Sequence, residues 1–348
     1  VIENYESYRM PGTLGEISKE EFFETMANHI KAVLHHSRKI GFCFSYATEV
    51  LPNKDGRLLQ FSKEVKVRDL IGVVIGENLL KTIGDMGLDG EKDIVLLNDT
   101  VATLLGGKAT YPDREFESYI GFILGTGTNT CYIEQNNNIK KAKNLVEKPG
   151  STIINIESGG YSKAPRSLID EEYDYQTINP GEYTFEKMIS GKYQGGLITG
   201  VIKKAAKEGL FSDFFSEKIN KIDKLTSKDI NDFLYHPYSK SILSTCCSDE
   251  TDDSIVLYHL SDCIIERAAK LVAINLSSIL LKTGYGENPC KPVCITAEGS
   301  TFYKSKLFKK KLDYYIKDYL NDKKGLYCEF VKAENATLIG AAIAGLLN

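Results

Sequence analysis

The pattern of apolar and polar positions in the first third of the chain predicts short strands that alternate with helices. Mainly apolar runs, which are typical of buried strands, occur at 40–45, 58–61, 94–97 and 119–124. Apolar residues at helical spacing predict helices over 18–39, where Ser18 can cap the first turn, and over 69–83. An alternating order of strands and helices predicts an α/β fold.

Helical spacing dominates the chain from about residue 180 onward. The segments that show it most clearly are 185–193, 197–206 and 255–282. The long third segment begins at Asp252-Asp253-Ser254, which can cap a helix, and stops before Gly284. A strand is expected at 292–296, and the small residues at 338–347 predict a buried helix that packs closely on its neighbours.

Composition limits the classes of function that these elements can serve. A net charge of −4 and a pI near 5.9 give no basis for binding nucleic acid. No apolar stretch reaches the roughly 20 residues that a membrane span needs, so we expect no membrane partner and a cytoplasmic location. The eight cysteines contain no Cys-x-x-Cys pair, which predicts reduced thiols and no metal-binding side chains.

Two predicted strands end in residues that are suited to catalysis. Asn98-Asp99-Thr100 follows one strand, and the Gly-Thr-Gly-Thr turn at 125–128 follows the next. Sites in α/β proteins form at the carboxyl ends of strands. Asp99 could accept a proton from an alcohol, and the turn could bind phosphate oxygens through its N–H and hydroxyl groups. Both also have a structural interpretation, because Asp99 could cap a helix and the turn could simply join two strands.

Three further charged residues could contribute to the same chemistry. Glu157 ends an apolar run in a turn, and Glu186 lies on a helix after Asn179-Pro-Gly181. With an asparagine amide, two carboxylates can hold several hydroxyls of one polyol. Lys63 could offset the charge on a transferring phosphoryl group. Taken singly, each of these residues could equally be a solvated surface charge.

Taken together and in this order, these segments resemble the hexokinase family over nearly the whole chain. The similar segments are residues 42–46, 60–63, 97–103, 124–132, 155–157, 179–191 and 297–301. The resemblance implies an actin-like, ribonuclease H-like α/β fold with two domains and a cleft between them. The small domain would comprise residues 1–97 joined by the C-terminal helix at 338–348, and the large domain would comprise residues 98–337.

The resemblance also implies a reaction and a set of site residues. The γ-phosphoryl group of ATP, with Mg²⁺, would pass to the 6-hydroxyl of a hexose such as glucose, as in the first step of glycolysis. Asp99 would be the catalytic base, and Lys63 would steady the developing charge. The hexose would be bound by Ser45, Ser62, Lys63, Asn98, Asp99, Asn129, Glu157 and Glu186. ATP would be bound by Gly125, Thr126, Gly127, Thr128, Gly299 and Ser300.

Departures from the family pattern leave alternatives open. The chain does not begin with Met and has no Asp-Gly-Gly-Thr loop, so we expect the first strands of the small domain to be missing and this chain alone to be weakly active or inactive. One alternative is a non-catalytic sugar sensor on the same scaffold. Another is a kinase for a different hexose, because Ala47 and Tyr183 are changes near the implied sugar site. We expect a monomer or a homodimer.

Overall fold

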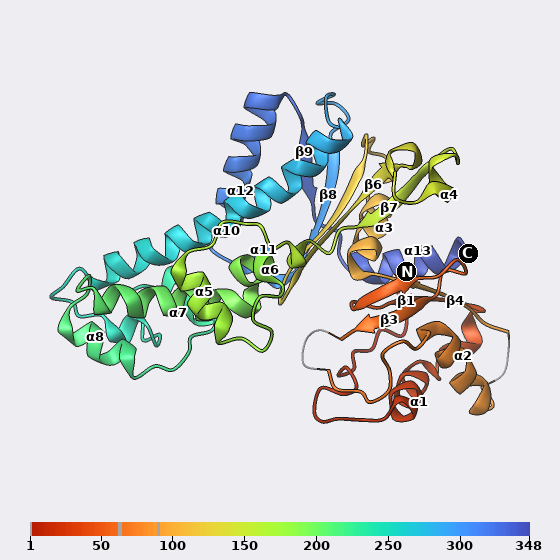
Figure 1. Ribbon diagram of the computed structural model, residues 1–348, viewed down its shortest axis with the longest axis horizontal. Helices are drawn as coiled ribbons and strands as arrows, with labels where there is room; N and C mark the ends of the chain where they lie inside the picture. Colours follow the sequence, from red (N-terminus) through yellow and green to blue (C-terminus); the bar gives the residue numbers. More distant parts are fainter. Residues whose placement is uncertain (1, 62–64, 89–90) are drawn as a thin grey trace. The chain divides into compact units, whose positions relative to one another are not determined.

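The computed structural model describes residues 2–61, 65–88 and 91–348. Contacts divide the chain into two compact units (Figure 1). Unit 1 comprises Val1–Thr110 and Glu334–Asn348, and unit 2 comprises Tyr111–Ala333. Both units combine strands and helices, so the α/β class that the sequence predicts is confirmed.

Unit 1 contains two pairs of strands and the helices that pack on them. Its elements are α1 (Lys19–Ile30), η1 (Leu34–His36), β1 (Lys39–Cys43), β2 (Ala47–Val50), β3 (Gly56–Gln60), α2 (Ile75–Asp85), β4 (Asp93–Leu97), α3 (Asp99–Thr110) and α13 (Ala336–Leu346). β1 and β4 are parallel, with Cys43 opposite Leu97, while β2 and β3 form an antiparallel hairpin. The Ser18 hydroxyl accepts the Glu21 N–H at 3.1 Å, so the predicted cap of α1 is confirmed.

Helices α3 and α13 pack through small residues that bring their backbones into direct contact. A Cβ added at Gly340 would lie 1.8 Å from the Ala102 carbonyl oxygen, and one at Gly106 would lie 2.1 Å from that of Ala336. Only glycine permits such an approach. This packing places α3 in unit 1, so the unit extends to Thr110 and resumes at Glu334. The boundaries expected from the sequence, after residue 97 and before residue 338, assigned α3 to the other domain.

Unit 2 is built on a five-stranded mixed sheet with the order β7-β6-β5-β8-β9. Its strands are β5 (Tyr119–Leu124), β6 (Thr128–Gln135), β7 (Ser151–Asn155), β8 (Val293–Glu298) and β9 (Cys328–Val331). β6 is antiparallel to both β5 and β7, whereas β5, β8 and β9 run parallel to one another. The sequence predicts the bounds of β5 correctly, because this strand is a continuous apolar run between polar segments.

Helices contribute most of the remaining core of unit 2. They are η2 (Asn136–Asn138), α4 (Lys143–Val146), η3 (Ser158–Gly160), α5 (Leu168–Tyr175), α6 (Thr184–Ile189), α7 (Gly191–Lys207), α8 (Asp213–Asn220), α9 (Ser227–Tyr235), η4 (Ser244–Cys246), α10 (Asp253–Thr283), α11 (Ser300–Lys304), α12 (Phe308–Ile316) and the π-helix η5 (Lys317–Lys324). In Figure 1, α10 runs from the region of α8 towards β8. Its buried face includes Leu257, Ile265 and Leu276. Among the helices of the described residues, none is both long enough and apolar enough to cross a bilayer.

A charge cluster between α10 and α12 predicts a pH dependence of stability. Glu266 accepts hydrogen bonds from Lys270, Tyr315 and Lys311, which lower its pKa from 4.5 to about 2. A carboxyl group whose pKa is lower in the folded state stabilises the fold above its unfolded pKa and loses that effect as the pH falls. We therefore expect the thermal midpoint to fall from about pH 4.5 towards pH 2. Glu266→Gln should lower the midpoint at pH 7 and flatten this acid limb; an unchanged limb would contradict the assignment.

Candidate active site

One edge of the sheet in unit 2 gathers most of the residues that the sequence singles out. β5 and β8 are parallel and end together, with Ile123 opposite Glu298. β6 is antiparallel to β5 and therefore begins at this edge, while β7 ends there, with Asn155 opposite Cys131. The topology alone thus brings together the 125–128 turn, the start of β6, and the residues after β7 and β8.

Asn129 at the start of β6 is the best-fixed side chain at this edge. It is 8% exposed, and its Oδ1 accepts the backbone N–H groups of Thr130 at 2.6 Å and Ser158 at 3.3 Å. Its Nδ2 therefore faces the other way, donating to Asn155 Oδ1 at 2.8 Å and to Glu157 Oε1 at 3.0 Å. Asn155 Nδ2 donates to the same Glu157 oxygen at 2.7 Å. The result is a cluster of two amides and one carboxylate at a strand edge.

Glu157 itself has a left-handed backbone conformation, with φ of 53°. Such a conformation costs about 1–3 kcal/mol for a residue with a Cβ and occurs most often at functional sites. The exposed side chain is held by the two amides described above. The strain is consistent with a carboxylate that is positioned for a ligand rather than for packing.

Glu186, on α6, lies against the turn that opens β6. Its Oε2 accepts the backbone N–H of Thr128 at 2.9 Å. A Cβ at Gly127 would lie 2.6 Å from the same oxygen, so the carboxylate fits only because this residue is glycine. Burial, followed by the negative charges of Glu157, Glu182 and Glu186, raises the pKa of Tyr183. Acidic side chains from two separate segments therefore face the same region.

The 125–128 turn approaches the end of β8 closely. A Cβ at Gly125 would lie 3.6 Å from the Gly299 Cα and 3.8 Å from the Ser300 nitrogen. Gly299 has φ of 115°, and a Cβ there would lie 2.3 Å from the Leu124 carbonyl oxygen. The exposed residues Thr126 and Ser300 flank this backbone contact. Closely packed glycines beside exposed hydroxyl-bearing residues form a turn of the kind that can bind phosphate oxygens.

Unit 1 presents its own candidate residues where β1 and β4 end. The Phe44 N–H donates to the Leu97 carbonyl at 2.9 Å, so Ser45 and Asn98 follow neighbouring parallel strands. Asn98 Oδ1 accepts the Thr100 N–H at 2.9 Å and caps α3. Asp99 is the first residue of α3 and is half-buried, and its Oδ1 also accepts the Thr100 N–H, at 2.8 Å. The helix-capping role that the sequence left open for Asp99 is therefore shared with Asn98, since both side chains accept the Thr100 N–H.

Two predicted site residues lie outside the part of the chain that the structure describes, and one residue of the observed cluster was not predicted. Ser62 and Lys63 lie outside the described residues. Asn155 was not among the predicted site residues, although a polar residue ending the apolar run before Glu157 was a usable signal. Among the described residues there is no group of three or more His, Cys, Asp or Glu side chains that could hold a metal ion.

Comparison with known proteins agrees with this architecture. Two models of a family described as hexokinase match the chain, one over residues 1–109 and the other over residues 119–347. Hexokinase-5 of Oryza sativa subsp. japonica is 29% identical over 99% of this chain and 72% of its own length. Hexokinase-2 of Arabidopsis thaliana is 29% identical over 88% of this chain, which spans 63% of that protein.

Solved structures give the same fold at lower identity. The hexokinase of Schistosoma mansoni complexed with glucose has a TM-score of 0.77 and 22% identity, and the match covers 98% of this chain and 78% of that one. A glucokinase of the ROK family from Streptomyces griseus, in complex with glucose and AMPPNP, has a TM-score of 0.57 and 13% identity over 97% of this chain and 90% of its own. The fold is therefore that of the actin-like ATPases. Within that class, the chain belongs to the hexokinase family.

Proposed function

We propose that this protein transfers the γ-phosphoryl group of ATP to the 6-hydroxyl of a hexose such as glucose. The observation that carries the proposal is the cluster of Asn129, Asn155 and Glu157 beside Glu186 at one sheet edge. Carboxylates and amides fixed in this way can accept from and donate to several hydroxyls of one sugar ring. Family membership and the glycine-rich turn next to the cluster support ATP, a phosphoryl donor, as the second substrate.

The sugar-binding roles follow from which atoms are already oriented. Asn129 Nδ2 is directed at the carboxylate side of the cluster because its Oδ1 is occupied by two backbone N–H groups. Glu157 and Glu186 offer oxygens that can accept hydrogen bonds from sugar hydroxyls. Ser45 and Asn98 keep the sugar-binding roles that the family resemblance implies. Ser62 and Lys63 keep the sugar-facing roles that the family resemblance implies.

Of the predicted phosphate-binding residues, Gly125, Thr126, Gly127, Gly299 and Ser300 keep that role. Thr128 instead shapes the turn, because it is 7% exposed, its N–H donates to Glu186 and its hydroxyl donates to the Ile123 carbonyl oxygen. Gly299 fits against the Leu124 carbonyl only because it has no Cβ, and this brings the Gly299–Ser300 backbone next to the 125–128 turn, as a shared phosphate site would need. Mg²⁺, bound mainly by phosphate oxygens and water as is usual at such sites, would neutralise charge that develops during transfer. The residues of this chain then have three tasks, which are to hold the phosphates, to orient the hexose, and to remove the proton of its 6-hydroxyl.

Asp99 is the proposed acceptor of that proton. It extends from the first turn of α3, whose N–H groups favour a negative side chain. Removing the proton as the oxygen attacks phosphorus keeps a poorly nucleophilic alcohol from acquiring positive charge, which is the usual role of a carboxylate in kinases.

Measurement of ADP formation with a panel of acceptors tests the proposal. The purified protein is incubated with Mg²⁺ and ATP together with glucose, mannose, fructose, galactose, acetate or no acceptor. ADP formation that depends on a hexose is expected. Glucose binding by calorimetry without ADP formation would indicate a sugar sensor instead. If no hexose binds and none stimulates ADP formation, the proposed function is wrong.

Replacement of Glu157 by Gln should weaken hexose binding selectively. The amide cannot accept from Asn129 Nδ2, Asn155 Nδ2 and sugar hydroxyls together as a carboxylate does. Loss of one hydrogen bond to a charged group corresponds to about 1.5–3 kcal/mol, or roughly 10-fold to 150-fold in Kd. Glu147→Gln is a matched control, since Glu147 lies on the exposed surface after α4. Calorimetric titration with glucose should show weakening for the first variant and not for the second.

A further inference from the structure

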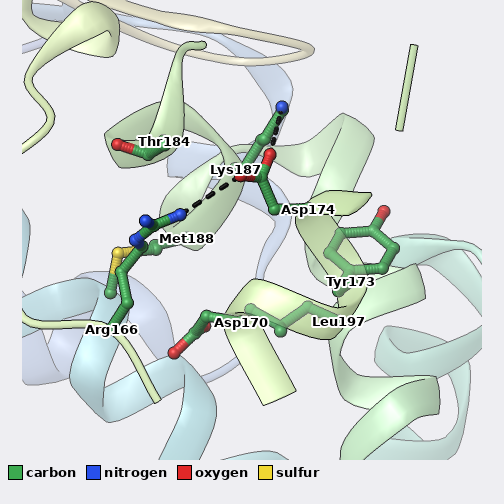
Figure 2. A pocket seen from close by; sticks show the side chains of 8 residues that line it. All are labelled: Arg166, Asp170, Tyr173, Asp174, Thr184, Lys187, Met188 and Leu197. Atoms are coloured by element: carbon green, nitrogen blue, oxygen red, sulfur yellow. Dashed lines mark hydrogen bonds and ion pairs between the residues drawn. The ribbon is translucent and has the colours of Figure 1, made fainter. Parts of the chain in front are cut away.

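A buried ion pair joins α6 to α5, and its α6 member, Lys187, is the residue after Glu186. Lys187 is 5% exposed and Asp174, on α5, is 7% exposed. Lys187 Nζ donates to Asp174 Oδ1 at 2.5 Å, and Arg166 Nη1 donates to Asp174 Oδ2 at 3.1 Å. Figure 2 shows Arg166 and Lys187 converging on the carboxylate of Asp174 in the wall of a small pocket. Although burial alone would raise it, the hydrogen bond from Lys187 and further polar contacts lower the pKa of Asp174.

Each member of the pair also holds the loop that leads into α6. Lys187 Nζ donates to the carbonyl oxygen of Asn179 at 2.5 Å. Asp174 Oδ2 accepts the N–H of Gly181 at 2.9 Å. The pair therefore fixes one backbone acceptor and one backbone donor, two residues apart, in the 179–183 loop. A buried charge pair that also satisfies backbone groups specifies one conformation of the segment that it contacts.

That conformation determines where the side chain of Glu186 points. The loop ends at Tyr183, a left-handed residue with φ of 51°, and α6 begins at Thr184. Such a backbone persists only where surrounding contacts enforce it. Glu186 and Lys187 are adjacent on one short helix, so anchoring Lys187 on one side fixes the rotation of α6. With that rotation fixed, the Glu186 carboxylate lies where it accepts the Thr128 N–H.

Helix α6 is also connected, through its first residue, to the segment that carries Glu157. Thr184 Oγ1 donates to the carbonyl oxygen of Tyr161 at 3.2 Å. Tyr161 directly follows η3, whose first residue, Ser158, donates its N–H to Asn129. Both candidate sugar-binding carboxylates therefore depend on the placement of one loop.

We propose that Asp174 and Lys187 are positioning residues for hexose binding. They hold the side chain of Glu186 and the segment that carries Glu157 in the positions that bind the sugar. The inference rests on the proposed function, because it assumes that Glu186 contacts the sugar. Neither residue of the pair is assigned a contact with the substrate. Their effect on hexose affinity is transmitted through the 179–183 loop and the rotation of α6.

Lys187→Met and Asp174→Asn test the inference in the full chain. Lys187→Met keeps the buried aliphatic stem but removes the ammonium group. Asp174→Asn replaces one accepting oxygen by an NH₂ donor, which then faces the donors Lys187, Arg166 or Gly181. A displacement of a binding group by about 1 Å can cost up to about 100-fold. We expect each variant to raise the hexose Kd, by calorimetry, and the hexose KM about 10-fold or more. The KM for ATP should stay close to that of the unmodified protein.

Asp170→Asn is the matched control for loss of a buried charge. Asp170 lies one turn before Asp174 on α5, is 5% exposed, and receives two hydrogen bonds from Arg267 at 2.7 Å. Its other partner is Ser167, at the start of the same helix. This variant should lower the thermal midpoint as much as Asp174→Asn does, with an unchanged hexose Kd. Equal effects of the two variants on hexose Kd would reduce the pair to a purely structural role and overturn the inference.

Glu186→Gln separates failure of the inference from failure of the proposed function. If Glu186→Gln weakens hexose binding but Lys187→Met and Asp174→Asn, folded by circular dichroism, do not, only the positioning role is wrong. If Glu186→Gln leaves the hexose Kd unchanged, the sugar-binding role of Glu186 fails and the inference fails with it. Should one variant of the pair not fold, the other gives the same comparison.

Discussion

Replacing Asp99 by Asn is expected to lower kcat about 10²-fold to 10⁴-fold, the range in which a general base contributes. The amide has nearly the same shape as the carboxylate and can still accept the Thr100 N–H that Asp99 accepts at 2.8 Å. The start of α3 should therefore be preserved, while the ability to take a proton is lost. Because the amide can still hydrogen-bond to a sugar hydroxyl and the other proposed binding residues are unchanged, the hexose Kd should stay near that of the unmodified protein.

Initial-rate measurements of ADP release, paired with calorimetric titration of glucose, check this result. Asp93→Asn is the control. Asp93 begins β4, the strand that leads to Asp99, and it forms an exposed ion pair with Lys39 at 2.8 Å. This variant should leave kcat unchanged. A kcat for Asp99→Asn within a few-fold of that of the control would remove Asp99 from the mechanism.

Gly340→Ala is expected to destabilise unit 1 by about 3 kcal/mol, near the upper end of the cost of overpacking. The added methyl group would lie 1.8 Å from the Ala102 carbonyl oxygen, which is backbone and cannot rotate away. Relief requires α3 and α13 to separate. Since Asp99 begins α3, catalysis should weaken even in the protein that remains folded.

Gly84→Ala is the matched control for this prediction. Gly84 lies inside α2, and a Cβ there would meet nothing within 4 Å. Alanine is favoured over glycine in a helix by about 1 kcal/mol, so this variant should be neutral or slightly stabilised. Urea denaturation, followed by circular dichroism, compares the two. A neutral Gly340→Ala would show that the two backbones are not in contact as described.

The fold was predictable where a single local signal decides the structure. Continuous apolar runs identified β4 and β5, and the cap at Ser18 identified the start of α1. Predicted bounds were wrong where chain reversals interrupt a helical pattern. The helix expected over 69–83 begins only at Ile75, because Asp69 and Gly72 adopt positive φ. The helix expected over 18–39 ends at Ile30, and a 3₁₀ turn follows.

The candidate site was predictable only as a set of strand ends. The sequence indicated Asp99, Glu157 and the 125–128 turn because each follows an apolar run. It could not indicate the pair of Asp174 and Lys187, which are separated by a loop and meet only when α5 and α6 fold together. The Gly106 and Gly340 contacts were likewise invisible, because small residues predict close packing without naming the partner. The roles proposed for the individual site residues remain predictions.

The most direct test of the central claim is to identify the product. The purified protein is incubated with Mg²⁺, ATP and glucose labelled with ¹³C, and the mixture is followed by ³¹P and ¹³C NMR. We expect equal amounts of ADP and of a glucose monophosphate ester whose carbon–phosphorus coupling places the phosphate on the 6-oxygen. A phosphate ester at another hydroxyl, or ADP and inorganic phosphate without any sugar ester, would contradict the central claim.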